Sequence, residues 1–278
     1  MINNLCSQLS YSSAFSEIKV RVENHLLWIT LNRPDFSNAF SIQMMDELLP
    51  VLKKANFDDQ IRVIIIQGEG KAFCAGGDVK DMENKSGMFA GEPNELRENY
   101  MQGIQQIPLT MHSLQKPVIA LVNGAAIGAG CDFACMCDLR IGTPQAKFAE
   151  TFSKLSLVPG DGGTYFLSRV VGFAKASEMF FTGDMIQADE ALRIGLLNHI
   201  YPEQDVQNKV RELANKIASN APVAIKMTKR ALIHAQENSL QSHLDLLSAY
   251  QGISQRTNDH FEGLKALKNK TSADFKGL

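Results

Sequence analysis

A run of small residues followed by an acid occupies the middle of the chain. Residues 124–130 carry no side chain larger than a methyl group apart from Ile127, and Asp132 is the first acid after them. The run follows an apolar segment, residues 117–122, and we expect it to open a helix over residues 132–137. Exposed N–H groups at the N-terminus of a helix bind negative charge. The spacing therefore predicts an anion-binding cradle with a candidate acid or base within one turn of it.

A second segment has the same character. Residues 61–67 have the pattern of a buried strand, residues 68–71 turn the chain, and residues 73–79 again leave the backbone bare before a short helix. Two such units can offer one N–H each to a single carbonyl oxygen, which makes an oxyanion hole. Removing one donor of this kind costs ~2.7–4 kcal/mol of transition-state stabilisation. The alternative interpretation is that these glycines only let helices pack closely on strands.

The elements around these loops predict an α/β fold. Residues 18–31 alternate and then become apolar, which indicates a hairpin, and Ser41 is placed to cap an amphipathic helix. The apolar strands at 61–67 and 117–122 are separated by helical and loop segments. That alternation is typical of strands buried on both faces of a sheet.

Beyond Gly162 the pattern is almost entirely helical, with apolar residues at three-to-four spacing over residues 211–218, 222–236 and 239–253. Residues 83–95 are polar and contain two glycines and a proline. They predict a loop, which is either a lid over the site or a plain surface loop.

Composition argues against several classes of partner. The 278 residues are 45% hydrophobic and 21% charged, with a net charge of −2, so the charge gives no reason to bind nucleic acid or an anionic membrane. No apolar run approaches the ~18 residues of a membrane span, and residues 1–16 lack the basic residues of a targeting signal.

The five cysteines include Cys131, Cys135 and Cys137, whose spacing is not that of a zinc site. An odd number without a disulfide framework indicates a reducing compartment, here the cytoplasm.

In their order and spacing, six motifs resemble the crotonase, or enoyl-CoA hydratase/isomerase, family, and the resemblance extends through roughly residues 17–270. The motifs are residues 29–34 with Asn38 and Ala39, residues 73–78, 116–120, 123–138, 159–164 and 181–184.

The resemblance implies a fold and an assembly. The fold is a crotonase-type spiral of β-β-α units over residues 17–200, ending in a helical region over residues 201–278. That region builds homotrimers in the family, and trimers often pair into hexamers. Residues 1–16 are expected to be a flexible tail.

The resemblance also implies the binding residues. The backbone N–H groups of Gly77 and Ala129 donate to the thioester oxygen of an acyl-CoA. CoA enters as part of the substrate, and no other cofactor and no metal are implied. The contacts to the substrate and its CoA fall on Phe36, Ser37, Ala39, Gly76, Asp78, Val79, Lys80 and Phe152.

The acidic residues depart from the hydratase pattern. Hydratases of the family carry two glutamates, one of which falls at Asp132 and the other at Phe152. Glu150 lies two residues away and would reach the site only if the loop slipped. Water addition needs one group to activate water and one to handle the proton at the α carbon, so the loss of an acid at residue 152 argues against ordinary hydration.

Asp161 is a second candidate acid or base. Aspartates at or next to this point occur in dienoyl-CoA isomerases, dihydroxynaphthoyl-CoA synthases, ring-opening isomerases of phenylacetate breakdown and chlorobenzoyl-CoA dehalogenases. In the last two groups the aspartate falls at Gly160, although the aromatic Phe152 also resembles the dehalogenase pattern. The alternative interpretation is that Asp161 merely caps a helix beginning at Gly162.

The sequence therefore predicts an enzyme that isomerises or hydrates the double bond of an enoyl-CoA, as in fatty-acid β-oxidation, with proton transfer by Asp132, Asp161 or both. Isomerisation is favoured because one or two carboxyl groups can move a proton between carbons. One alternative is an acyl-CoA hydrolase or dehalogenase that uses an aspartyl nucleophile. Another is a non-catalytic family member that binds RNA or a partner protein, which predicts a basic stripe that the balanced charge argues against.

Overall fold

The computed structural model describes residue 11 and residues 14–278. The tail expected over residues 1–16 therefore lies, for residues 1–10 and 12–13, outside the described residues. Ser16, at its end, donates hydrogen bonds from its N–H and hydroxyl to Oε1 of Glu47, at 2.9 and 2.8 Å.

Six strands form the larger sheet, in the spatial order β1-β2-β3-β5-β7-β10. The predicted hairpin is confirmed, because β1 and β2 pair antiparallel, whereas the other neighbours in this sheet run parallel. Helices cover both faces, which explains why β2 and β5 are buried along their whole length. The strands are β1 (Ile18–Glu23), β2 (Leu26–Leu31), β3 (Val63–Gly68), β5 (Val118–Val122), β7 (Leu139–Gly142) and β10 (His199–Ile200).

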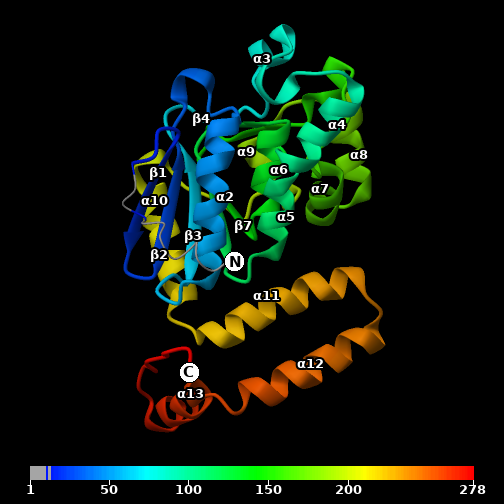
Figure 1. The fold of residues 1–278 in the computed structure, drawn as a ribbon. Helices are drawn as coiled ribbons and strands as arrows, with labels where there is room; N and C mark the ends of the chain where they lie inside the picture. The colour runs from blue at the N-terminus through cyan, green and yellow to red at the C-terminus, as the bar shows by residue number, and fades with distance from the viewer. Residues whose placement is uncertain (1–10, 12–13) are drawn as a thin grey trace.

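Four short strands form a second sheet, β4-β6-β8-β9. Each of β3, β5 and β7 in the first sheet is followed by a strand of the second sheet and then by helical structure. This repeated step from one sheet to the other makes the predicted spiral of β-β-α units, which is coloured from blue to green in Figure 1. The strands are β4 (Ala72–Cys74), β6 (Ala125–Ile127), β8 (Lys147–Ala149) and β9 (Ile186–Gln187).

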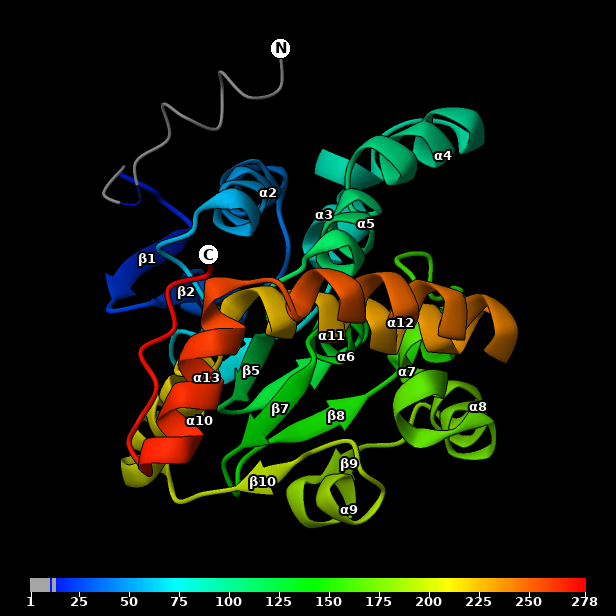
Figure 2. The same ribbon diagram turned by 90° about the horizontal axis from the view of Figure 1, so that it is seen from below.

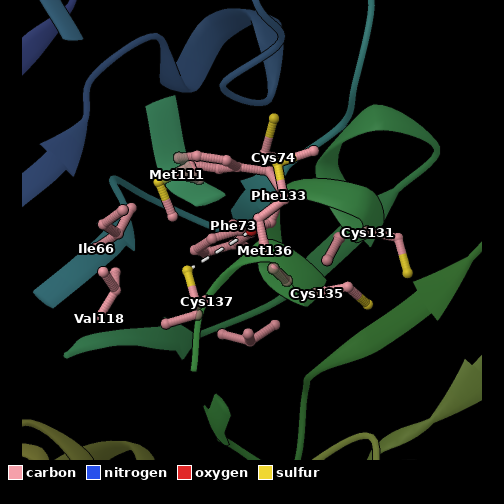
Figure 3. Close-up of a cluster of buried hydrophobic side chains, with 14 of the residues drawn as sticks. Ile66, Phe73, Cys74, Met111, Val118, Cys131, Phe133, Cys135, Met136 and Cys137 are labelled. Atoms are coloured by element: carbon pink, nitrogen blue, oxygen red, sulfur yellow. Dashed lines mark hydrogen bonds between the residues drawn. The ribbon is translucent and has the colours of Figure 1, made fainter. Parts of the chain in front are cut away.

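Helix α6 (Ala129–Met136) lies at the centre of the core. Its Phe133 packs edge-on against Phe40, with ring centroids 5.4 Å apart, and stacks on Phe73 at 6.2 Å. Figure 3 shows the rings of Phe73 and Phe133 near Cys74, Cys131, Cys135 and Cys137, which are buried free thiols. The sequence expectation for the start of this helix was wrong by three residues, because Gly128, at φ 53°, already makes the turn into it.

Helix α2 (Ile42–Phe57) begins as the sequence predicts. The hydroxyl of Ser41 accepts a hydrogen bond from the N–H of Met44 at 3.0 Å and so caps the helix. Apolar residues at helical spacing, Met44, Leu48 and Leu52, are fully buried against the sheet.

The polar segment expected to be a loop over residues 83–95 contains helical turns. It begins within α3 (Val79–Asn84), passes through the short helix η2 (Gly87–Phe89) and enters α4 (Pro93–Gln102), which is followed by α5 (Gln106–Ser113). The capping box between Glu92 and Glu95 explains why α4 starts where it does despite the low apolar content of this segment.

The C-terminal third is helical, as predicted, apart from β9 and β10. Helix α10 packs on the outer face of the larger sheet, where Val206, Val210 and Ala214 are buried against Trp28 and its neighbours. Figure 2 shows α11 and α12 lying side by side across one end of the core. The helices are α7 (Gly163–Val171), α8 (Phe173–Thr182), α9 (Ala188–Arg193), α10 (Glu203–Ala218), α11 (Pro222–Glu237), α12 (Leu240–Ser254) and α13 (Asn258–Asn269).

Within the described part of the chain, every helix is too short or too polar to cross a lipid bilayer.

Candidate active site

One cavity brings together residues from both glycine-rich loops and from the segment before α7. It has a volume of about 160 Å³, and the predicted site residues that line it are Gly77, Val79, Ala129, Phe152 and Asp161. Its remaining wall is largely apolar. That wall includes Phe40, Met82, Met88, Phe89, Tyr100, Ile104, Ile127, Leu155 and Leu157.

The two loops touch each other through Gly76. A Cβ built on this residue, which has a φ of +86°, would lie 2.7 Å from the carbonyl oxygen of Ile127 and 3.1 Å from the nitrogen of Ala129. Only glycine permits that approach with that backbone conformation. The contact brings the segments that carry Gly77 and Ala129 to one cavity.

The N–H groups of Gly77 and Ala129 suit an oxyanion hole. Ala129 is the first residue of α6, so its N–H has no carbonyl one turn earlier in the helix to bond. Neither N–H donates to a backbone carbonyl in the loops and turns of the described chain. Both residues face the cavity, so both donors remain available to an oxygen placed there.

Two other glycines in the same motifs serve close packing, which was the alternative interpretation of these loops. A Cβ on Gly124 would lie 2.0 Å from the carbonyl oxygen of Lys71, and one on Gly130 would lie 1.9 Å from that of Cys74. These glycines let adjacent β-β-α units close on one another. Gly76 and Gly77 therefore border the site, whereas Gly124 and Gly130 hold its support together.

Asp161 lies on the cavity wall and does not cap α7. The residue that precedes that helix is Gly162, at φ 100°, and no side chain caps it. Asp161 is buried, and its Oδ1 has no hydrogen-bond partner among the described residues. Burial raises its pKa, although a hydrogen bond with Asp132 works in the opposite direction. Among the described residues, it is the one acid that lines this cavity.

Asp132 lies behind Asp161 and not on the cavity surface. It stands in the first turn of α6 and is fully buried. Its carboxyl group packs on Gly163 of α7, where an added Cβ would be 1.8 Å from Oδ1. Burial first, and then the neighbouring carboxyl groups of Asp161 and Glu150, raise the pKa of Asp132 well above its usual range.

Glu150 joins these acids without any slip of the loop. Phe152 lines the cavity, at the position where the resemblance places the second glutamate of the hydratases. The side chain of Glu150 does not line the cavity and is fully buried. Sequence reasoning missed this placement. Strand alternation could have found it, because Glu150 is two residues beyond the buried Phe148 and so follows the inward face of β8.

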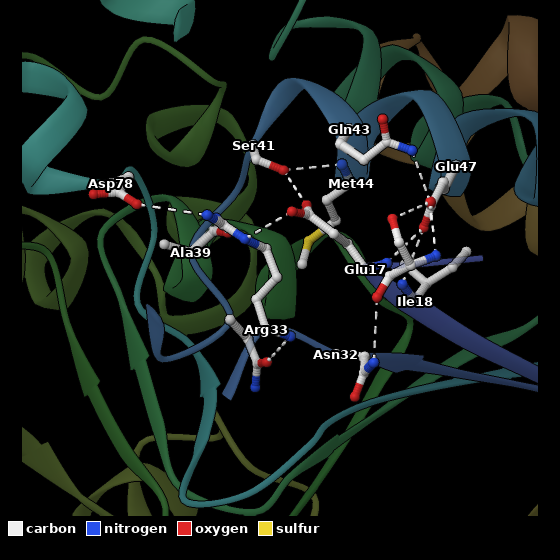
Figure 4. Close-up of polar contacts among 12 residues, drawn as sticks. Glu17, Ile18, Asn32, Arg33, Ala39, Ser41, Gln43, Met44, Glu47 and Asp78 are labelled. Carbon is white, nitrogen blue, oxygen red and sulfur yellow. Dashed lines mark hydrogen bonds and ion pairs between the residues drawn. The ribbon is translucent and has the colours of Figure 1, made fainter. Parts of the chain in front are cut away.

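A polar framework built around Arg33 holds the loop over residues 36–39. The guanidinium donates to the carbonyl oxygen of Ala39 at 2.6 Å and pairs with Glu17 at 3.1 Å and with Asp78 at 3.7 Å. Figure 4 shows Arg33 reaching between Glu17 and Asp78. Arg33 was not among the predicted site residues, although it lies within one of the motifs that carry the resemblance.

The loop over residues 36–39 is also bonded directly to the loop that carries Gly77. The carbonyl oxygen of Ser37 accepts from Ala75 at 3.0 Å, and the N–H of Phe40 donates to Gly76 at 2.8 Å. The backbone around Gly77 is therefore positioned from both sides.

The predicted CoA contacts that remain lie at the surface. Phe36 is 47% exposed, with the Arg33 guanidinium 4.5 Å above its ring. Val79 is 61% exposed and also lines the cavity, so it marks the mouth. Lys80 follows it in α3 with an exposed side chain, and its N–H donates to Oδ1 of Asp78 at 3.0 Å.

Sequence reasoning did not identify the apolar wall contributed by α3, η2 and α4. Met82, Met88, Phe89 and Tyr100 line the cavity from this side. The adjacent apolar pair Met88 and Phe89 in a polar segment was the available signal. The ring of Tyr100 packs on Gly160, where an added Cβ would be 2.7 Å from Cε1, and burial, followed by the charge of Asp161, raises the pKa of Tyr100.

The chain belongs to the enoyl-CoA hydratase/isomerase family. The family model of that description matches residues 21–278. The short-chain-enoyl-CoA hydratase of Clostridium acetobutylicum is 36% identical over 249 residues, which is 89% of this chain and 93% of that protein. The 1,2-epoxyphenylacetyl-CoA isomerase of Escherichia coli is 34% identical over 256 residues, covering 92% and 97% of the two chains.

Solved structures agree with this assignment. The enoyl-CoA hydratase of Bacillus anthracis superposes with a TM-score of 0.87 at 34% identity, over 95% of this chain and all of that one. The crotonase-type fold predicted from the motifs is therefore confirmed.

Proposed function

We propose that this protein converts an acyl-CoA thioester that carries a carbon–carbon double bond, through an enolate stabilised in the cavity. One observation carries the proposal: two unoccupied backbone donors, on Gly77 and Ala129, share an apolar cavity with the carboxyl group of Asp161. Donors aimed at a developing oxyanion in a site of low dielectric stabilise it strongly.

The chemistry follows from the placement of these groups. The thioester oxygen accepts from the N–H groups of Gly77 and Ala129, which makes the neighbouring C–H acidic. Asp161 as carboxylate takes a proton from one carbon, negative charge passes to the oxygen, and the double bond shifts. The same proton then returns to a different carbon, so the isomerisation consumes no co-reactant. Asp132 does not line the cavity. It influences the reaction through Asp161, whose pKa it lowers.

We favour isomerisation over hydration because of the wall beside Asp161. Phe152 lines the cavity at the position where hydratases of the family carry an acid. A single carboxyl group facing the cavity can shuttle a proton between carbons, but it cannot activate a water molecule and separately protonate the α carbon in the usual way. Relatives with both names, hydratase and isomerase, share this family.

A panel of CoA thioesters tests the proposal. The panel comprises 2-enoyl, 3-enoyl and dienoyl thioesters of linear and ring-bearing acids, assayed for a shifted double bond and for 3-hydroxyacyl product. We expect the double-bond shift to be faster. Faster formation of 3-hydroxyacyl product would reverse the preference for isomerisation, and a covalent acyl group on Asp161 detected by mass spectrometry would favour the hydrolase or dehalogenase alternative.

We also propose that the enzyme needs no metal and no cofactor besides the CoA of its substrate. Backbone donors and carboxyl groups suffice for the steps above. Turnover should therefore survive dialysis against EDTA, and a loss that an added metal restores would contradict this.

We further propose that the spiral over residues 17–200 is the catalytic core and that residues 201–278 assemble it into a trimer or a hexamer. Exposed apolar side chains on α12 and α13, including Leu240, Leu244, Phe261 and Leu267, support this. The four cysteines within the described residues are buried free thiols, which supports a reducing compartment such as the cytoplasm. Light scattering of the purified protein would measure its assembly.

A further inference from the structure

A side chain from outside the cavity holds the peptide group that leads into Asp161. Nε2 of Gln105 donates to the carbonyl oxygen of Gly160 at 2.8 Å, across a separation of 55 residues. That carbonyl belongs to the planar peptide unit that joins Gly160 to Asp161, so its direction is coupled to the position of the Asp161 Cα. Gln105 itself does not line the cavity.

The segment before Asp161 has little other polar support. Residues 158–161 belong to neither a helix nor a strand. None of their N–H or carbonyl groups pairs with a backbone group in the loops and turns of the described chain. Among the described residues, Gln105 supplies the one side-chain hydrogen bond to this stretch of backbone. The direction of the Gly160–Asp161 peptide group therefore depends on that bond.

The ring of Tyr100 packs against the same glycine. A Cβ built on Gly160 would lie 2.7 Å from Cε1 and 3.2 Å from Cδ1 of this ring. Gly160 does not have a positive φ, so the structure uses its small size and not its backbone freedom. The N–H of Gln105 donates to the carbonyl oxygen of Tyr100 at 3.0 Å. One short stretch, residues 100–105, thus makes both contacts with Gly160.

This stretch is anchored to the core around Gln105. Ile104 precedes Gln105 and Ile107 lies in the first turn of α5, and both are buried in the main apolar cluster. Tyr100 packs against that cluster as well. A side chain that extends from an anchored backbone has less freedom to lose when it makes a hydrogen bond, so Gln105 is well placed to hold another segment.

We infer that Gln105 is a positioning residue for Asp161: its amide fixes the Gly160–Asp161 peptide group and so sets where the carboxyl group stands relative to the oxyanion donors. The catalytic part rests on the proposed function, in which Asp161 moves the substrate proton. A misplacement of about 1 Å at reacting groups can cost on the order of 100-fold in rate. An amide suits this role because it is a neutral donor, which binds the carbonyl without adding a charge beside a buried acid.

The first test needs no substrate. Gln105→Met removes the donor and keeps an unbranched side chain of similar length. Gln106→Met is the matched control, because the adjacent Gln106 also donates from Nε2 to a backbone carbonyl at 2.8 Å, but to that of Met101. In crystal structures of the two variants and the wild type, we expect the Gly160–Asp161 peptide group to shift in Gln105→Met alone. An unmoved peptide group in Gln105→Met, or an equal shift in Gln106→Met, would overturn the inference.

A second variant covers the case in which Gln105→Met does not fold. Gln105→Asn keeps the amide but is one methylene shorter, so the amide no longer reaches the Gly160 carbonyl from the same backbone position. The peptide group should again shift. A crystal structure of Gln105→Asn in which the group keeps its wild-type position would also contradict the inference.

The catalytic part is tested with whichever thioester the wild type converts. Gln105→Met should lower kcat by about 10- to 100-fold and leave KM unchanged, because Gln105 does not line the cavity. Gln106→Met should keep both values. An unchanged kcat, or a loss of kcat accompanied by an equal rise in KM, would indicate that Gln105 does not act through Asp161. Failure of the proposed function would appear differently, as a wild type that converts no thioester while the crystal structures still show the shift.

Discussion

Asp132 of α6 and Gly163 of α7 are in direct contact, and only the absence of a side chain at residue 163 leaves room for the carboxyl group. A Cβ on Gly163 would lie 1.8 Å from Oδ1 and 2.4 Å from Oδ2 of Asp132. The glycine has an ordinary helical conformation, so its small size, and not its backbone freedom, is what the site uses. The position of Asp132 behind Asp161 therefore depends on a residue that makes no polar contact with either.

Gly163→Ala should displace the Asp132 carboxyl group and disturb the proton transfer it supports. Crowding of this kind typically costs ~1–3 kcal/mol of folding free energy, and we expect turnover to fall as well. Gly252→Ala is a matched control, because an added Cβ on α12 would meet no atom within 4 Å, and alanine favours a helix by up to ~1 kcal/mol. Denaturant unfolding and steady-state kinetics of both variants measure these effects; equal activity of Gly163→Ala and wild type would show that the contact is dispensable.

Asp161→Asn should abolish double-bond migration while leaving the protein folded. The side chain does not cap α7, so the loss of ~1 kcal/mol expected for a missing cap should be absent. Affinity for a saturated acyl-CoA should change little, because the oxyanion donors remain. Calorimetric binding alongside single-turnover kinetics separates the two effects, and a variant that retains wild-type turnover would remove Asp161 from the mechanism.

Asp132→Asn should lower turnover by less than the ~100-fold expected for a group that transfers the substrate proton itself, because Asp132 does not line the cavity, and it should also change how stability depends on pH. The folded-state pKa of Asp132 is raised well above the unfolded value of about 4. Folding therefore takes up a proton between those two values. The free energy of unfolding falls as pH rises through this window, by up to ~1.4 kcal/mol per pH unit for this group.

Since asparagine does not titrate, Asp132→Asn should flatten that fall. Urea unfolding at a series of pH values from 4 to 8 measures the slope. A variant as pH-dependent as the wild type would mean that Asp132 is not protonated on folding.

Phe152→Glu should create hydratase activity. The side chain lines the cavity where an acid is missing, and a positioned acid–base group there should raise formation of 3-hydroxyacyl product by on the order of 100-fold. Phe152→Gln is the control, because it removes the ring and adds a polar group of the same size without an acid. A similar gain in both variants would show that space or polarity, and not proton transfer, limits hydration in the wild type.

Local patterns were sufficient to predict most of the elements that carry the site. The strands at residues 61–67 and 117–122, the cap at Ser41 and the bare loops before α3 and α6 each follow from a short stretch of sequence. The residues that line the cavity opposite these loops do not, because Met88 and Tyr100 lie 11 and 23 residues beyond Gly77 and reach the site from separate helices. No short-range periodicity states which cavity a side chain on such a helix will enter.

The buried acids also show that a sequence pattern does not predict which side chains reach the cavity. Asp132 was expected to face the acyl cavity, yet it is fully buried behind Asp161. Which of several nearby carboxyl groups reaches the cavity surface depends on how α6 and α7 pack, and that distance is set by Gly163. A motif supplies the acid, while the tertiary contact decides its exposure.

One side of the cavity wall is built on buried elements and the other side on exposed helices, and we expect the two sides to differ in mobility. Gly77 lies in a loop that follows the buried strand β4, and Ala129 begins the buried helix α6, whereas neither α3 nor α4 contains a buried residue. Segments with so little buried surface open locally at a small fraction of the global free energy of unfolding. The amides of α3 and α4 should therefore exchange with deuterium far sooner than those of β3. An acyl chain can then enter through transient opening on this side, while the proposed oxyanion donors, Gly77 and Ala129, keep their geometry.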